Sequence, residues 1–437
     1  MKKIAFISPI GSWSKNKKLL KIWYGDSGAK AYLDSLTGIG TGLLILAALT
    51  PPNIKIKFID EKHEKIDFDK KYDLVAITAM TQQATRAYEI ADNFRKNNIT
   101  VILGGIHVTS IPEEAINHAN SIVIGEAENL WPKVIKDLLS GKLKRIYRSS
   151  EYVDLEKSPS PRFNLLKPKN YKVIWLQTTR GCPRGCEFCV ATKIYGSKVR
   201  RKTIDQVVNE IIQVKSIWPR FKLGFADDNL FLDRSYARRL VDELIKLDVR
   251  WFGQTDVSIA EDVEMLRKLK KSNCMSLFIG FESISKISLS KADKFDWKSK
   301  QIKKYPEAIK NIQSFGIGIV GSFIVGFDED NYTIFDALSN FIIENNIYAS
   351  QITALTPLPG TKIRERLKKE NRILSTKWDN YTFTNINFIP AKMTPKELEE
   401  GLEMVYKKIY SNDIVLRKNM LFKEIYKGTK KIEKVAL

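Results

Sequence analysis

Cysteine and histidine are scarce in this sequence. The 437 residues contain four cysteines and three histidines, and residues 1–181 contain no cysteine at all. Four cysteines are too few for a disulfide framework, so we expect a protein of a reducing compartment, the cytoplasm. No histidine lies near the cysteines in the sequence, which argues against a structural zinc site with mixed ligands.

Long apolar runs are also absent. No run approaches the roughly 20 residues that span a bilayer, and the longest candidate, residues 38–49, ends just before Pro51 and Pro52. The N-terminal Met1-Lys2-Lys3 precedes an apolar stretch that is too short for a secretion signal, so we expect a first β-strand there. The motif G-x-G-x-x-G before a helix is missing as well, which argues against a nicotinamide or flavin site.

Acidic residues are outnumbered by basic ones. The 72 lysines and arginines against 50 aspartates and glutamates give a formal charge of +22. Such an excess can indicate a nucleic-acid or anionic-membrane partner. The lysines are dispersed and no compact basic patch contains interleaved aromatic residues, so solvated helix faces are the favoured interpretation. We predict no dedicated nucleic-acid domain and no transmembrane segment.

Three of the four cysteines form one short motif, C-x3-C-x2-C, at Cys182, Cys186 and Cys189. The motif follows an apolar run, 171–176, that reads as a strand. It therefore lies in a loop at a strand's C-terminal end, where α/β folds hold their chemistry. The fourth, Cys274, is expected at the N-terminal end of another strand, as a buried structural thiol.

Three thiolates without a fourth protein ligand suit a [4Fe–4S] cluster with one open iron. Gly181 and Gly185 allow the backbone of the loop to come close to such a group, and Phe188 offers an apolar shield that would tune its potential. The open iron is a place where a substrate or cofactor can bind.

Strands and helices alternate along most of the chain. Five strands in residues 1–150 predict a doubly wound parallel sheet, and six β/α units in residues 171–361 are too few to close a full barrel. The fold class is therefore α/β, with a Rossmann-like first domain and a partial (β/α)6 barrel. A Pro/Ser-rich linker is expected at 151–170. Residues 362–437 are expected to form a small α+β region, with a strand over 381–388 and a basic helical tail, that closes over the substrate.

The first domain resembles the cobalamin-binding domain of the B12-dependent radical SAM enzymes over residues 54–141. The resemblance is carried by Asp60-Glu61 and by the segments 73–78, 104–109, 112–115 and 125–128. It implies cobalamin contacts from the strand ends at Asp60, Glu61, Thr78, Gly104, Gly105, His107, Gly125 and Glu126. The motif D-x-H-x-x-G is missing, which implies a corrinoid held without a protein histidine on cobalt.

The cysteine motif is that of the radical SAM superfamily, and the resemblance extends over nearly the whole chain. It implies that Cys182, Cys186 and Cys189 ligate the [4Fe–4S] cluster and that S-adenosylmethionine binds the open iron. The implied contacts to S-adenosylmethionine come from Phe188, Asp227, Asp228, Asn229, Gln254, Glu282 and Ser322. Helix capping and loop salt bridges remain open as alternative roles for Asp227, Asp228 and Glu282.

The resemblance implies an enzyme that reductively cleaves S-adenosylmethionine to a 5′-deoxyadenosyl radical and methylates an unactivated carbon through methylcobalamin. One alternative is a non-methylating radical SAM oxidoreductase or cyclase with a resident or vestigial corrinoid domain. An RNA-modifying methylthiotransferase is less favoured, because those relatives carry an N-terminal cysteine trio. The implied partners are a reduced ferredoxin- or flavodoxin-type electron donor and a substrate of unknown kind, a small molecule, lipid or peptide.

Overall fold

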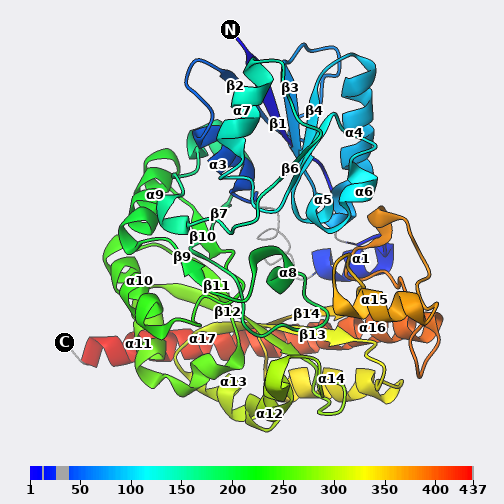
Figure 1. Cartoon of the computed structure of the whole chain (residues 1–437). Coiled ribbons are helices and arrows are strands. Elements are labelled where there is room, and N and C mark those ends of the chain that lie inside the picture. Colours follow the sequence, from blue (N-terminus) through cyan, green and yellow to red (C-terminus); the bar gives the residue numbers. More distant parts are fainter. Residues whose placement is uncertain (12–13, 26–38, 436–437) are drawn as a thin grey trace.

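The computed structural model describes residues 1–11, 14–25 and 39–435. The N-terminal part is a six-stranded, all-parallel sheet in the order β2-β1-β3-β4-β5-β6 (Figure 1). The strands are β1 Lys3–Ser8, β2 Lys55–Asp60, β3 Leu74–Thr78, β4 Val101–Gly104, β5 Ser121–Ile124 and β6 Ile146–Arg148. Five of these match the expected strands; the short β6 was not predicted. The doubly wound sheet is confirmed.

Both faces of this sheet are covered. Successive side chains of its strands therefore point alternately into two hydrophobic cores. Ile4 and Phe6 of β1 belong to one core, while Ala5 and Ile7 belong to the other. Helices α3 (Gly42–Ala48) and α7 (Trp131–Leu139) contribute to the first core. The second core is covered by α4 (Ala84–Lys96), α5 (Ile106–Ser110) and α6 (Pro112–Ala115).

The central part is a second parallel sheet of six strands in the order β14-β13-β12-β11-β10-β7. Its strands are β7 Val173–Leu176, β10 Lys222–Phe225, β11 Trp251–Thr255, β12 Cys274–Glu282, β13 Gly318–Val325 and β14 Ala349–Ala354. Neighbours in space are neighbours in sequence and the two edge strands do not pair with each other. This is the expected partial barrel.

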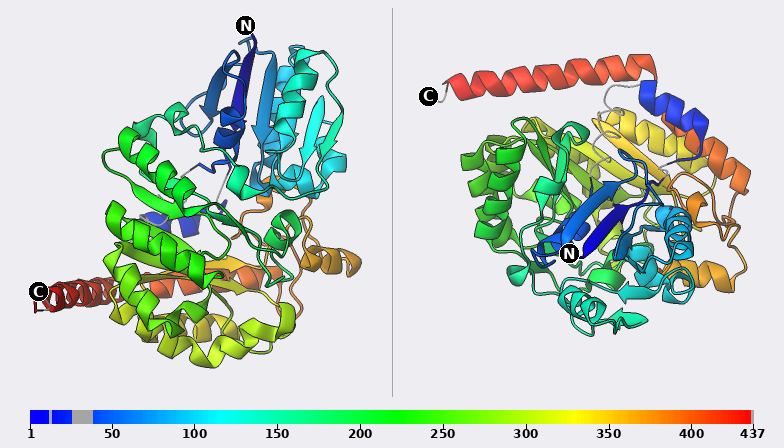
Figure 2. Two further views of the ribbon diagram at one scale, coloured as in Figure 1. Left: turned by 60° about the vertical axis from the view of Figure 1, so that its left-hand side comes forward. Right: turned by 90° about the horizontal axis from the view of Figure 1, so that it is seen from above.

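Amphipathic helices cover the outside of the partial barrel (Figures 1 and 2). They are α9 Ile204–Ile217, α10 Arg234–Leu247, α11 Val263–Lys271, α13 Tyr305–Ser314 and α14 Thr333–Glu344. Three of them begin with a side-chain cap, at Thr203, Asp233 and Asp262. Helix α9 has a reciprocal capping box between Thr203 and Gln206. Short loops then return the chain to the next strand.

The carboxyl ends of the N-terminal strands point toward the barrel (Figure 1). Side chains join the two parts there: Tyr171 donates a hydrogen bond to Asp60 across 2.8 Å. The segment 151–170, expected as a linker, contains three short 3-10 turns, Leu155–Lys157, Phe163–Leu165 and Pro168–Asn170. Phe163 and Leu166 of the linker belong to the same continuous core as the N-terminal sheet and the barrel.

The C-terminal region is helical, with α15 Lys362–Lys369, a 3-10 turn at Trp378–Asn380, α16 Pro395–Ile409 and α17 Asn412–Val435. The expected strand over 381–388 is wrong, since its only β pairing is a single bridge between Ile373 and Phe388. Tyr381 and Phe388 are fully buried, so their apolar pattern reflects core packing rather than a pleated sheet.

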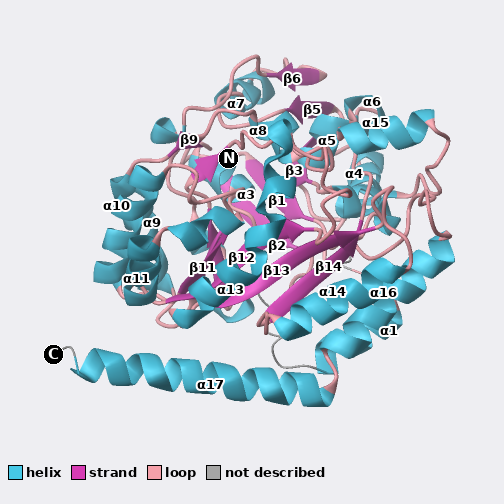
Figure 3. Ribbon diagram, turned by 90° about the horizontal axis from the view of Figure 1, so that it is seen from below, coloured by secondary structure: helices cyan, strands magenta, loops and turns pink. Residues whose placement is uncertain are grey.

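The basic tail forms the expected helix. Helix α17 runs along one side of the molecule and extends past the barrel (Figures 2 and 3). The N-terminal helix α1 (Lys17–Gly25) lies beside α16, where Asn16 donates a hydrogen bond to Glu403 over 3.0 Å. In the part of the chain that the structure describes, no helix combines the length and apolarity needed to cross a membrane.

Candidate active site

The three clustered cysteines lie in the loop between the two-residue strand β8 (Thr179–Arg180) and helix α8 (Ala191–Tyr195). Strand β8 pairs antiparallel with β9 (Arg200–Arg201), which closes the base of the loop. Gly181 is required here: its φ is +101°, and a Cβ would lie 2.3 Å from the carbonyl oxygen of Lys198. Glycine thus lets the chain turn directly into Cys182.

The three thiols are close enough to influence one another electrostatically. Burial raises the pKa of Cys186 to about 12 and that of Cys189 to about 11. Cys186 feels the charges of Cys189 and Glu282, and Cys189 feels those of Cys182 and Asp228. An uncomplexed thiolate is therefore disfavoured here, and a bound cation would reverse that preference.

This donor set fits a polynuclear cluster better than a single ion. Among the residues that the structure describes, no three His, Cys, Asp or Glu side chains are arranged to hold one metal ion. The thiolates of a cubane cluster bind different irons, so they need not converge on one point. Cys274 begins β12, at the opposite end of its strand from the site, and burial raises its pKa. It has the structural position that the sequence predicted.

The two aspartates that follow β10, Asp227 and Asp228, differ in their hydrogen bonds. Asp227 is fully buried and accepts hydrogen bonds from Thr178 and Thr179, including 2.7 Å and 2.6 Å contacts to their hydroxyls. It holds the chain that leads into the cysteine loop, so its carboxylate is already occupied. Burial, with adjacent Asp227, raises the pKa of Asp228 to about 6, and its Oδ2 has no partner. Besides burial, the negative charge of Asp228 contributes to raising the pKa of both Cys182 and Cys189, so its carboxylate lies near these thiols.

Asn229 is also committed to internal bonds. Its side-chain amide donates to Asp256 over 2.8 Å and accepts from Thr255 over 3.3 Å. Asp256 in turn pairs with Arg184 of the cysteine loop at 2.6 Å. The Arg184 guanidinium lies 3.4 Å from the centre of the Trp297 ring. Sequence reasoning missed Arg184 and Asp256, because only the fold brings the cysteine loop to the end of β11.

Glu282 ends β12 in a left-handed conformation, with φ of +64°. That conformation is strained for a side chain of this kind and is typical of functional sites. Glu282 pairs with Lys298 at 2.9 Å, and the Lys298 side chain is only 7% exposed. Burial alone would lower the pKa of Lys298, but Glu282 and Cys186 together raise it. Sequence reasoning missed Lys298, because only the fold brings α12 (Trp297–Gln301) to Glu282.

Three further predicted residues lie half-buried around the barrel. Gln254 on β11 and Ser322 on β13 alternate with fully buried neighbours, so they share the interior-facing positions of their strands. Their side chains make no hydrogen bonds within the described residues. Phe188 packs edge-on against Phe327 with ring centres 6.0 Å apart, on the apolar side of the cysteine loop.

The strand ends of the N-terminal sheet carry the other predicted site. Asp60 accepts the Tyr171 hydroxyl, and Glu61 accepts two bonds from Arg86 at 2.8 and 2.6 Å. Both carboxylates thus have protein partners. Gly105 has φ of +98°, and a Cβ would lie 2.6 Å from the hydroxyl of Thr78. Gly104 and Gly125 have more open surroundings, with no atom closer than 3.8 Å to a Cβ.

The histidines all lie in the N-terminal domain and all have neighbours there. His63 lies 3.9 Å from Asp60 and packs edge-on against Tyr171. His118 pairs with Asp92 at 2.8 Å and stacks on Tyr88.

His107 is fully buried beneath Trp378, with ring centres 4.9 Å apart. Burial lowers its pKa to about 4, and its Nε2 lacks a hydrogen-bond partner. Trp378 belongs to the C-terminal region and donates to Glu114 at 2.6 Å. The ring therefore packs between domains instead of lining the open edge of the sheet.

Glu126 joins the two predicted sites. It pairs with Arg180 at 2.7 Å and Arg200 at 3.0 Å, and it accepts the backbone N–H of Val153. Arg180 also pairs with Glu128 at 2.6 Å, and the four side chains are between 3% and 14% exposed. Arg180 precedes the cysteine loop directly. Glu126 was predicted as a cobalamin contact; in the structure its carboxylate binds Arg180 and Arg200, next to the cysteine loop.

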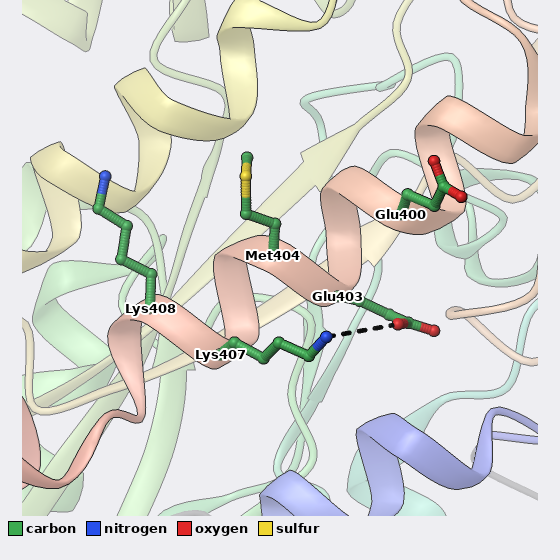
Figure 4. A pocket seen from close by; sticks show the side chains of 5 residues that line it. All are labelled: Glu400, Glu403, Met404, Lys407 and Lys408. Atoms are coloured by element: carbon green, nitrogen blue, oxygen red, sulfur yellow. Dashed lines mark ion pairs between the residues drawn. The ribbon is translucent and has the colours of Figure 1, made fainter.

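A groove of about 450 Å³ lies on the outer face of α16 (Figure 4). It is lined by Glu400, Glu403, Met404, Lys407 and Lys408. Glu403 pairs with Lys18 and Lys407. None of the candidate site residues lines this groove, so it is not part of the candidate site.

Similarity to known proteins follows the same division of the chain. Residues 45–135 match the B12 binding domain, residues 176–342 match the radical SAM superfamily, and residues 361–436 match a domain of unknown function (DUF4070). Two relatives come from Chlorobaculum tepidum. The bacteriochlorophyllide d C-12(1)-methyltransferase is 31% identical over 385 residues, covering 86% of this chain and 83% of that protein. The bacteriochlorophyllide d C-8(2)-methyltransferase is 31% identical over 391 residues, covering 85% and 86%.

A solved structure shares the fold. The radical S-adenosylmethionine methyltransferase TsrM from Kitasatospora setae, with cobalamin and a [4Fe–4S] cluster bound, superposes with a TM-score of 0.64 at 13% identity. The likeness covers 92% of this chain and 82% of that chain. The N-terminal sheet, the partial barrel and their order along the chain are thus common to both.

Proposed function

The chain belongs to the cobalamin-dependent radical SAM methyltransferases, and from that premise we propose which of its residues hold each cofactor. As a member of this family it is an enzyme that uses S-adenosylmethionine, a [4Fe–4S] cluster and cobalamin. When bound, these groups supply a carbon-centred radical and a transferable methyl group. The protein's own residues bind, orient and shield them.

We assign the cluster to Cys182, Cys186 and Cys189. The observation that carries this assignment is that one loop gathers these thiols at the barrel mouth, beside Asp228 and Glu282. The remaining cysteine, Cys274, lies at the opposite end of its strand. Phe188 and Phe327 form an apolar wall against this loop, which would keep water from the cluster and tune its potential.

For S-adenosylmethionine we assign Asp228 as the acceptor for the cationic amino group. Its free Oδ2 is buried and its carboxylate faces the cysteine loop, so an ammonium ion would satisfy it. Gln254, Glu282 and Ser322 are assigned to the remainder of the ligand from the interior of the barrel. Asp227 and Asn229 are positioning residues in this proposal, because their polar atoms hold the loop.

For cobalamin we assign the open edge of the N-terminal sheet near Thr78, Gly104 and Gly125. The edge faces the barrel, as transfer from the corrinoid to a substrate in the barrel requires (Figure 1). We propose that no histidine binds cobalt, because each of the three histidines packs against an aromatic ring of the protein. Asp60 and Glu61 border this edge. Hydrogen bonds from Tyr171 and Arg86 hold their carboxylates in place.

Reductive cleavage of S-adenosylmethionine needs a one-electron reductant, and we propose a ferredoxin- or flavodoxin-type protein in that role. The cytoplasm is the compartment that provides such a donor, and it keeps three free thiols reduced.

The reaction is tested by incubating the anaerobically reconstituted enzyme with S-adenosylmethionine, a methyl acceptor and a strong reductant, then quantifying nucleoside products.

Formation of both 5′-deoxyadenosine and S-adenosylhomocysteine is the expected result for methylation. Deoxyadenosine without S-adenosylhomocysteine would contradict methyl transfer and would support an oxidoreductase or cyclase. Cys186→Ala should abolish both products, whereas Cys274→Ala, the matched control, should retain them because its thiol is at the other end of the barrel. Equal loss in the two variants would overturn the assignment of the cluster.

A further inference from the structure

The segment 284–304, between β12 and α13, lies directly against the outside of the cysteine loop. The backbone N–H of Glu187 donates to the carbonyl of Ala292 over 2.9 Å, and the N–H of Lys294 donates to the carbonyl of Arg184 over 2.9 Å. The alkyl chain of Lys294 covers Gly185, where a Cβ would approach it to 3.2 Å. This segment therefore packs against the part of the loop from Arg184 to Glu187, which contains Cys186.

Two large apolar side chains of this segment are turned to solvent. Phe295 is 87% exposed, the largest value for any apolar side chain in the described part of the chain, and Ile287 is 69% exposed. Phe295 has φ of +66°. A bulky residue in this region costs on the order of 1–3 kcal/mol, so the surrounding structure must hold it there. The segment beside the cysteine loop thus presents two large apolar side chains to solvent.

The same segment is strongly basic. It contains seven lysines and two aspartates. Lys286, Lys291, Lys294 and Lys303 are exposed and have no ion-pair partner among the described residues. The two aspartates, Asp293 and Asp296, balance only two of the seven positive charges within the segment. The surface thus presents apolar side chains among unpaired positive charges.

Resting on the reductive step of the proposed function, we propose that segment 284–304 docks a small, negatively charged one-electron carrier protein. Electron transfer slows steeply with distance, and this segment is hydrogen-bonded to Arg184 and Glu187, on either side of Cys186. Basic charge steers an acidic carrier and fixes its orientation, while Phe295 and Ile287 supply the apolar contact of a small, transient interface. One electron leaves the reduced carrier and enters the cluster, with no bond or proton exchanged.

The location leaves the rest of the enzyme undisturbed. Helix α12, at the end of the segment, lies on the far side of the barrel from the N-terminal domain (Figures 1 and 2). A carrier bound there would not displace that domain. Lys298 of the same helix points inward to Glu282, so the segment also connects the surface with the interior of the site.

The test uses the full chain with Lys286, Lys291 and Lys303 each changed to Glu. A matched control changes Lys133, Lys136 and Lys142, which are equally exposed and unpaired but lie on or just after α7 of the N-terminal domain. Flavodoxin is the probe. Its binding to the chain is measured by calorimetry, with and without reconstituted cluster, at about 50 mM and about 300 mM salt. S-adenosylmethionine cleavage is then driven either by reduced flavodoxin or by titanium(III) citrate.

We expect the 284–304 variant to bind flavodoxin at least about tenfold more weakly at low salt and to lose the flavodoxin-driven rate in proportion. Its titanium-driven rate should match wild type, and the control should match wild type throughout. Phe295→Ala should weaken binding in the same way. Equal losses in both triple variants, or no loss, would overturn the proposal, as would lysine-dependent binding of an RNA oligonucleotide in place of flavodoxin. Failure of wild type with titanium would instead contradict the proposed function, while the binding experiment would still decide the docking site.

Discussion

Glu126→Gln should weaken the contact between the cysteine loop and the N-terminal domain and lower the free energy of unfolding. Glu126 lies just after β5, and its carboxylate is 3% exposed. It receives charged hydrogen bonds from Arg180 and Arg200 and a further bond from the backbone of Val153. Replacing the carboxylate by an amide leaves both guanidinium groups buried without that negative charge, although Glu128 still pairs with Arg180.

Removing one partner of a buried ion pair costs about 3–5 kcal/mol, and because Glu128 remains we expect the lower end, about 3 kcal/mol. The assays are urea-induced unfolding and deuterium exchange of residues 178–202. The exchange of that segment should rise, because Arg180 and Arg200 lie in the paired strands at the base of the loop. Glu151→Gln, an exposed glutamate nearby, is the control and should change neither quantity.

A double-mutant cycle sharpens the result. Arg200→Met removes a second partner of Glu126, and the double variant should cost less than the sum of the single changes, with a coupling of at least about 0.5 kcal/mol. A loss below about 1 kcal/mol for Glu126→Gln, with unchanged exchange of the loop, would refute the reasoning and would return Glu126 to the cobalamin contacts.

Three further predictions concern the same two domains. The free energy of unfolding should fall by about 3 kcal/mol as the pH drops from 6.5 to 4. His107 has a pKa of about 4 in the folded protein and is neutral there, whereas it takes up a proton near pH 6.5 in the unfolded chain. Urea unfolding of His107→Gln should lack this pH dependence. Gly105→Ala should destabilise the protein by about 2 kcal/mol or more, since its Cβ would meet Thr78 at 2.6 Å, while Gly104→Ala should be mild in a thermal melt. Asp228→Asn should weaken S-adenosylmethionine binding by about tenfold in equilibrium dialysis without lowering the melting temperature, because its Oδ2 has no internal partner. A drop in melting temperature with unchanged binding would show instead that Asp228 is structural.

Much of the fold could be predicted from the sequence because strand and helix periods alternate clearly. The six barrel strands and five of the N-terminal strands were placed within a few residues. The strand over 381–388 was misjudged because Tyr381 and Phe388 are apolar for core packing in an irregular chain. Propensity alone cannot separate those two cases, since both bury the same side chains.

The site was predictable where neighbouring residues carry the chemistry, as in the cysteine motif. It was less predictable where the fold brings distant residues together. Lys298, Arg184 and the Glu126–Arg180 pair depend on contacts between elements far apart in the chain. A strand-end carboxylate also looks the same in sequence whether the fold leaves one of its oxygens without a partner, as in Asp228, or pairs it with guanidinium groups, as in Glu126.

The central claim is that one chain holds an open iron–sulfur cluster on three cysteines and a corrinoid on its first domain. The most direct measurement is the iron and cobalt content, with the absorption spectrum, of protein produced anaerobically with cobalamin supplied. The account predicts about four irons and about one cobalt per chain, with iron lost and cobalt retained when Cys182, Cys186 and Cys189 are all changed to Ala. Iron retained by that variant, or cobalt absent from the wild-type chain, would contradict it.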